Sequence, residues 1–314
     1  MIKKLAHKVV NRLTVTLNSQ NETYHNASVQ AAINSSRSNY SKIKSLSEAD
    51  LKIYSQWGED GILDFLCLRL GLERPYFLEV GAGEFQECNS RFMVEFRNAS
   101  ATLVDANSGL EEVVAKSSSY WKTHLYAVVT WVTTENINRI IQSAKSSMGG
   151  LDIFSLDLDG NDYWILEAAD LSEFKIVVLE YNSIFGAELA LSVPTDEQFD
   201  RRVKHFSWLY YGASLRAFVN LMAIKGFAFA GTNLVRTNAF FIKKASVSQL
   251  PFDLPSDLTQ FTDCKIRESR DKFGRMNHLN IKDGVSVIKD MPIIQIINSQ
   301  NSQETTIGKA LGLS

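Results

Sequence analysis

The chain has 314 residues, of which 45% are hydrophobic and 22% are charged, an ordinary composition for a globular protein. The formal net charge of −2 argues against a general nucleic-acid-binding protein, which would be basic. No run approaches 18 apolar residues, so the sequence predicts no transmembrane helix. The three cysteines lack CxxC spacing and suit a reducing compartment, so we expect a cytoplasmic protein.

Residues 1–50 are predicted to form a helical arm and linker. Residues 2–13 place apolar side chains on one helical face and lysine and arginine side chains on the other. Such a helix could pack on its own protein, meet a second copy in a homo-oligomer, or lie on an anionic membrane surface. Residues 18–50 are rich in serine and asparagine, which is typical of a tether.

Residues 51–245 alternate between strand-like and helix-like patterns, which favours a doubly wound α/β sheet. The last two strands are joined by too few residues for a parallel crossover, so they should form an antiparallel hairpin. We expect a Rossmann-like, seven-stranded sheet with helices on both faces. Its strands are predicted at residues 76–80, 101–105, 124–130, 152–158, 175–181, 226–231 and 238–243, with a long helical stretch around 196–225 before the hairpin. Residues 246–314 are predicted to form a C-terminal extension without assignable chemistry.

The first predicted strand ends in Glu79, Gly81 and Gly83 and is followed by a helix-like segment. Strand, glycine turn and helix in this order form the first unit of a nucleotide-binding crevice. Gln86 stands where a dinucleotide fingerprint would have its third glycine, which argues against NAD or FAD. A carboxylate before the turn would not help to bind a pyrophosphate, but it would help to bind a cationic ligand.

Two further positions are candidates for binding a cofactor. Asp105 closes the second predicted strand, where a carboxylate can accept hydrogen bonds from ribose hydroxyls, although it could also cap the next helix. Gln56 lies at the start of a helix just before the first strand and could lend a polar side chain to the crevice. The alternative for Gln56 is ordinary helix-start chemistry.

Acidic residues cluster where the fourth and fifth predicted strands end. Asp157, Asp159 and Asp162 fall within six residues, and helix capping explains one of them. Glu180 and Asn182 follow the fifth strand. Oxygen ligands from Asp157, Asp159, Glu180 and Asn182 would suit Mg²⁺ or another divalent cation, and the alternative is polar contact with a substrate.

Residues after the fifth strand supply the remaining candidates. His205 lies among aromatic residues and could accept a hydroxyl proton as a general base, although such a histidine is more often structural. Tyr210, Tyr211 and Ser214 could bind substrate hydroxyls.

Four segments together resemble the FkbM-like family of S-adenosylmethionine (SAM)-dependent methyltransferases. They are Ser55–Asp60, Phe77–Gly83, Leu103–Ala106 and Ser155–Asp162, with Asp162 where the family commonly has glutamate, and the resemblance spans residues 54 to 244. It implies a class I methyltransferase fold, SAM as cofactor and O-methylation, with a sugar hydroxyl of a surface glycan or its precursor as the acceptor.

The resemblance also implies roles for individual residues. Glu79, Gly81 and Gly83 would hold the methionine end of SAM and Asp105 its ribose. Gln56 and Asp157 are further candidate cofactor contacts, and Asp159 or His205 would receive the proton.

Two other functions stay open at this point. An NAD-dependent oxidoreductase is disfavoured by the missing third glycine and the terminal hairpin. A non-catalytic interaction module is disfavoured by the intact Glu79, Gly81, Gly83 and Asp105 set.

Overall fold

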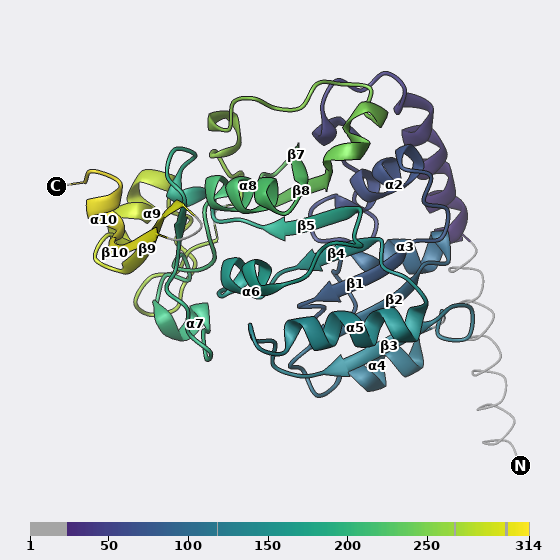
Figure 1. Cartoon of the computed structure of the whole chain (residues 1–314), viewed down its shortest axis with the longest axis horizontal. Helices are drawn as coiled ribbons and strands as arrows, with labels where there is room; N and C mark the ends of the chain where they lie inside the picture. Colours follow the sequence, from purple (N-terminus) through teal and green to yellow (C-terminus); the bar gives the residue numbers. More distant parts are fainter. Residues whose placement is uncertain (1–23, 118, 267, 299–300, 314) are drawn as a thin grey trace, which may run out of the picture. The chain divides into compact units, whose positions relative to one another are not determined.

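The computed structural model describes residues 24–117, 119–266, 268–298 and 301–313 (Figure 1). The predicted amphipathic helix at residues 2–13 lies outside the described residues. The chain divides into two units, one ending at Lys42 and the other beginning at Ile43. In the first unit, residues 24–39 are helical. Among the described residues, no helix has the length and apolar character needed to cross a bilayer.

A seven-stranded sheet organises the second unit, with strand order β3-β2-β1-β4-β5-β8-β7. The first five strands are parallel, and β8 is antiparallel to both of its neighbours. The order 3-2-1-4-5 is that of a doubly wound sheet, and the terminal hairpin distinguishes the methyltransferase version of it. The predicted class I methyltransferase fold is therefore confirmed. The strands are β1 (Tyr76–Val80), β2 (Ser100–Asp105), β3 (Leu125–Val129), β4 (Ile153–Leu156), β5 (Ile176–Glu180), β7 (Phe227–Thr232) and β8 (Asn238–Lys243).

Helices cover both faces of this sheet (Figure 1). Alternate side chains of a strand point to opposite faces, so the short apolar runs of the parallel strands can feed two cores. Leu78 and Val80 of β1 share one core with apolar residues of α5, α6 and α8, whereas α3 contacts β1 and β2. The helices are α2 (Glu59–Arg69), α3 (Ser90–Arg97), α4 (Leu110–Lys116), α5 (Ile137–Met148), α6 (Asp162–Ala168) and α8 (Leu215–Ile224).

The prediction of one long helical stretch around residues 196–225 is wrong. This stretch contains the one-turn helix α7 (Arg201–Lys204) and then α8, separated by a loop. Trp208 and Gly212 in this loop have φ angles of 63° and 62°, in the left-handed region that ends a helix. The Asn182 side chain donates to the carbonyl oxygens of Leu209 and Tyr211 at 2.9 and 3.0 Å. The apolar residues of this stretch therefore pack as a loop held from the end of β5.

Residues 246–314 form more structure than the sequence predicts. A second sheet has the antiparallel order β10-β9-β6 and includes a strand from the segment after β5. Its core includes Phe185, Leu191, Ile288 and Ile293, all buried. The remaining elements are η1 (Leu46–Ala49), η2 (Ser183–Phe185), β6 (Leu191–Ser192), η3 (Lys244–Gln249), η4 (Thr259–Phe261), α9 (Ile281–Ile288), β9 (Pro292–Asn298), β10 (Asn301–Thr306) and α10 (Ile307–Ala310).

Candidate functional site

Two cavities lie at the carboxyl edge of the parallel strands. The glycine-turn cavity, of about 470 Å³, is lined by the turn after β1 and by the ends of β2 and β3. The C-terminal cavity, of about 570 Å³, is lined partly by the loop before α2 and partly by residues 263–284. Both volumes fall within the usual range for small-molecule sites. The two cavities share four lining residues: Asp157, Asp159, Arg201 and Arg202.

The glycine turn brings the ends of β1 and β4 into close contact. Gly81 has a φ of 89°, and a Cβ atom there would lie 1.7 Å from the Asp157 carbonyl oxygen, so a side chain is excluded. The Gly83 N–H donates to Asp105 Oδ2 at 2.8 Å, and Asp105 Oδ1 accepts the Asn107 N–H at 2.8 Å. Each carboxylate oxygen keeps a second lone pair for a ligand hydroxyl. Gly81, Gly83 and Asp105 therefore meet in one cavity.

The Glu79 carboxylate is bonded to the backbone at the start of α3. Its oxygens accept the N–H groups of Asn89 and Ser90 at 2.7 and 2.9 Å, and the Ser90 hydroxyl also donates to it. The residue is 3% exposed, and burial raises the pKa of its carboxyl group. Among the described residues, the lining of neither cavity includes Glu79. The structure thus places its carboxylate at the start of α3, and direct contact of Glu79 with a cofactor stays a prediction.

The Ser55–Asp60 segment directs two side chains into the C-terminal cavity. Gln56 and Trp57 line that cavity, and the glycine-turn cavity is lined by other described residues. Contact of Gln56 with a cofactor stays a prediction. Glu59 is buried and accepts hydrogen bonds from the Asn233 and Asn238 side chains, both at 2.7 Å. The acids of this motif thus shape the loop that presents Gln56 and Trp57.

The Asp60 carboxylate holds the backbone of this loop. Its Oδ2 accepts the N–H groups of Ile53, Tyr54 and Ser55 at 2.7, 2.6 and 2.9 Å. Its Oδ1 is buried, and within the described residues it has no hydrogen-bond partner. Burial raises the pKa of Asp60 from 3.8 to about 6 despite the three donors.

We expect Asp60 to make stability depend on pH. The folded state binds its proton more tightly than the unfolded state, so this contribution is fully present below pH 3.8 and is lost as the pH rises through 6. The pKa difference corresponds to about 3 kcal/mol in the free energy of unfolding. Asp60→Asn keeps an oxygen for the three N–H donors and removes the titration. Urea unfolding at pH 4.5 and pH 7 should show the wild type losing about 2 kcal/mol relative to the variant. If the difference in unfolding free energy between wild type and variant is the same at both pH values, Asp60 does not cause the pH dependence.

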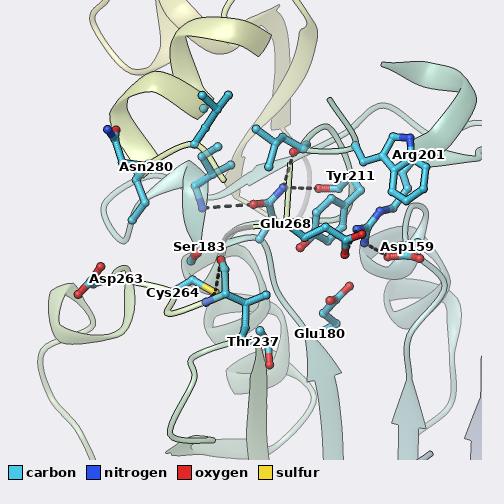
Figure 2. Close-up of a pocket in the computed structure, with 18 of the residues that line it drawn as sticks. Asp159, Glu180, Ser183, Arg201, Tyr211, Thr237, Asp263, Cys264, Glu268 and Asn280 are labelled. Atoms are coloured by element: carbon cyan, nitrogen blue, oxygen red, sulfur yellow. Dashed lines mark hydrogen bonds and ion pairs between the residues drawn. The ribbon is translucent and has the colours of Figure 1, made fainter. Parts of the chain in front are cut away.

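The loop after β4 separates the three clustered acids by role. Asp162 is buried and accepts the N–H groups of Leu158 and Gly160 at 2.8 and 2.9 Å, so its carboxylate holds the loop. Asp159 has a φ of 56°, the left-handed region that aspartate tolerates better than most residues. Its carboxylate reaches Arg201 (Figure 2). Asp157 and Asp159 line both cavities.

Asp157, Asp159 and Glu180 form one cluster, with a carboxylate oxygen from each within 4.8 Å of the others. The carboxylates of Asp157 and Glu180 accept no hydrogen bond from any described residue, whereas that of Asp159 accepts one from Arg201. The surrounding protein shields both carboxylates in part from the solvent of the cavity, which disfavours their charged forms. The negative charges of the neighbouring acids disfavour these forms further. Both effects raise their pKa values well above the usual range. Two carboxylates of this kind suit a hydrogen-bond donor, a cation or a proton.

Arg201 is the cation nearest to this cluster that the structure describes. Its Nη1 atom bonds Asp159, and its Nη2 atom lies 3.5 Å from Glu268 Oε2 (Figure 2). The guanidinium carbon lies 4.5 Å from the centre of the Tyr211 ring. Burial alone would lower the pKa of Arg201, but Asp159, Tyr211 and Glu180 raise it above its ordinary value. The residue therefore stays charged between the two cavities.

Arg201 contacts one of the carboxylates of the predicted divalent-cation site. Asp157, Asp159 and Glu180 have the oxygen chemistry that Mg²⁺ prefers. However, Arg201 already bonds an oxygen of Asp159. Two unit charges about 4 Å apart interact by roughly 4 kcal/mol near a protein surface, so a divalent ion beside the guanidinium would meet about twice that repulsion. The set fits a divalent ion poorly while Arg201 stays in place.

Several other predicted residues have structural contacts. Asn182 lines the C-terminal cavity, but its Oδ1 accepts the Ile184 N–H at 3.2 Å while its amide group holds the 205–214 loop. Its side chain thus has a loop-holding role rather than that of a free metal ligand. Tyr210 donates to the Pro292 carbonyl oxygen at 2.7 Å, and Ser214 caps α8. Tyr211 lines the C-terminal cavity, as expected for a substrate contact.

His205 contacts its neighbours Ser207 and Phe206 in the loop before α8. Within the described part of the chain, the lining of neither cavity includes it. Its Nδ1 atom lies 2.7 Å from the Ser207 hydroxyl, and its ring packs against Phe206. Burial lowers the pKa of its imidazole. A role of His205 as a general base stays a prediction.

Some lining residues were missed by the sequence analysis. Trp131 and Val132 line the glycine-turn cavity directly after β3. The reasoning that found Asp105 at the end of β2 would also have found them. Arg201 and Glu268 meet across 67 positions of sequence, and no local pattern predicts that contact.

Similar proteins are found among solved structures. No protein-family model matches the chain, and no curated protein matches its sequence. Solved structures that are similar include a candidate sarcosine dimethylglycine methyltransferase from Galdieria sulphuraria (13% identity, 55% of this chain and 61% of that chain), a candidate RNA methyltransferase from Pyrococcus horikoshii (15%, 68% and 98%) and TnmH (10%, 59% and 57%), each with a TM-score of 0.33. The chain thus spans about three fifths of the length of the first of these. Likenesses of this size do not carry a neighbour's activity to this chain.

Proposed function

We propose that this protein is a SAM-dependent O-methyltransferase. One observation carries the proposal: the cavity behind the glycine turn and the larger C-terminal cavity meet at Asp157 and Asp159. Gly81, Gly83 and Asp105 lie where this fold binds the cofactor, and Asp105 has lone pairs free for ribose hydroxyls. SAM would occupy the glycine-turn cavity, and the acceptor would occupy the C-terminal cavity.

The chemistry needs a junction of this kind. An acceptor oxygen attacks the methyl carbon in line with the sulfonium, so the C–O bond forms as the C–S bond breaks. S-adenosylhomocysteine leaves, and the hydroxyl proton passes to a carboxylate. Holding both reactants in line supplies much of the rate enhancement. Glu180 and Asp157 have raised pKa values, which makes them stronger bases than ordinary carboxylates.

The C-terminal cavity supports a hydroxyl-rich acceptor. Gln56 adds an amide group to the carboxylates, and Trp57 and Tyr211 add aromatic rings. An anionic acceptor would be repelled by the acids at its inner end. Together with the resemblance to FkbM-like methyltransferases, these features favour a sugar hydroxyl, in a surface glycan or its precursor, as the methyl acceptor.

Calorimetry with SAM and with NAD⁺ tests the proposal. We expect SAM to bind with a sub-millimolar dissociation constant and NAD⁺ to show no heat of binding under the same conditions. NAD⁺ binding without SAM binding would indicate an oxidoreductase. Failure of both ligands would indicate a non-catalytic interaction module.

A further inference from the structure

Arg201 joins three segments that are distant in the sequence. It begins α7, where the Asp200 side chain accepts the Arg202 N–H and fixes the helix start. Its guanidinium then reaches Asp159 after β4 and Glu268 in the C-terminal segment. Its side chain is only 13% exposed. A buried arginine with two carboxylate partners and an aromatic face is held in a defined position.

This position lies beside the place that a metal ion would need. The three carboxylates that could hold a divalent ion are those of Asp157, Asp159 and Glu180. Arg201 bonds Asp159 directly, and the charges of both Asp159 and Glu180 act on its guanidinium. The negative charge of the cluster is therefore already balanced in part by the protein itself.

We infer that Arg201 is the resident cation of this junction: it positions Asp159 between the two cavities and keeps divalent ions out of the Asp157, Asp159 and Glu180 set. Arg201 acts through Asp159 and is thus a positioning residue. The inference concerns the carboxylates and their counter-ion, so its test does not depend on methyl transfer being the reaction.

A second consequence concerns the C-terminal segment. The Nη2 contact with Glu268 ties residues 263–284, which line the C-terminal cavity, to the same guanidinium that orients Asp159. Glu268 also contacts Arg270 at 3.3 Å, and the Arg270 N–H donates to the Ser207 carbonyl oxygen at 3.2 Å, so the segment stays attached when Arg201 is replaced. Replacement of Arg201 should thus change the cluster more than the fold.

Titration of the full-length protein with Mn²⁺, followed by the electron paramagnetic resonance signal of the free ion, tests this inference. The wild type should show no saturable binding up to millimolar Mn²⁺. Arg201→Met keeps an unbranched apolar stem near Tyr211 and removes the charge, so we expect its Mn²⁺ affinity to rise by about a hundredfold. Arg201→Lys keeps the charge and should bind Mn²⁺ as weakly as the wild type does.

Arg139→Met is the matched control, because Arg139 is an exposed arginine of α5 and, among the described residues, the lining of neither cavity includes it. It should leave Mn²⁺ binding at the wild-type level. Saturable micromolar binding by the wild type would overturn the inference, and this measurement needs no variant to fold. Equal Mn²⁺ binding by wild type and Arg201→Met, with matching circular dichroism spectra, would also overturn it.

Discussion

Asp105→Ala is expected to lose about a hundredfold in SAM affinity, or about 3 kcal/mol. Two effects combine. The variant loses the carboxylate that would accept hydrogen bonds from the ribose hydroxyls, and it also releases the Gly83 N–H, which Asp105 now holds at 2.8 Å. Isothermal titration with SAM measures the loss directly.

Two further variants separate these effects. Asp105→Asn keeps one oxygen and should lose less affinity than Asp105→Ala. Glu111→Ala removes an exposed acid from the first turn of the next helix, α4, and should bind SAM as the wild type does. If Asp105→Ala binds SAM within about threefold of the wild type, SAM does not lie in the glycine-turn cavity as proposed.

Glu180→Gln should lower kcat by about 10²–10⁴-fold, the usual contribution of a general base. Glu180 lines the C-terminal cavity, whereas the glycine-turn cavity is formed by other described residues, so SAM affinity should stay unchanged. Because the pKa of Glu180 is raised well above 4.5, the wild-type rate should increase with pH until that pKa is passed. Single-turnover rates with labelled SAM, measured across pH, provide the test.

Asp159→Asn provides the comparison, because the sequence predicts Asp159 as the catalytic carboxylate. In the structure Asp159 is bonded to Arg201, which makes it less available to a proton than Glu180. If Glu180→Gln keeps kcat within about tenfold while Asp159→Asn loses it, Asp159 is the proton acceptor after all. Loss of SAM affinity in Glu180→Gln would instead place the cofactor differently.

The sheet was predictable because its signals are local. Five short apolar runs lie between helical patterns, and the connection between Thr232 and Asn238 is too short for a crossover. The second sheet gave no such signal, because β10 reads Asn-Ser-Gln-Glu-Thr-Thr and has no apolar alternation. Its partner β9 pairs with β6, about 100 positions earlier in the chain. Pairing over that distance is set by tertiary packing.

The candidate site was predictable where it depends on strand ends. Asp105, Asp157, Asp159 and Glu180 come to one edge because parallel strands deliver their carboxyl ends together. Residue roles within that edge were less accessible. Glu79 turned inward to the start of α3, since two backbone N–H groups lie within reach there.

The order in which the cavity walls leave the ribosome differs between the two ligand sites. The last residue that lines the glycine-turn cavity is Arg202, whereas the C-terminal cavity takes lining residues as far along the chain as Gly284. Synthesis runs from the N-terminus, and folding can begin on the emerging chain. The wall that would bind the donor is therefore complete in the emerging chain before the last part of the wall that would bind the acceptor is translated.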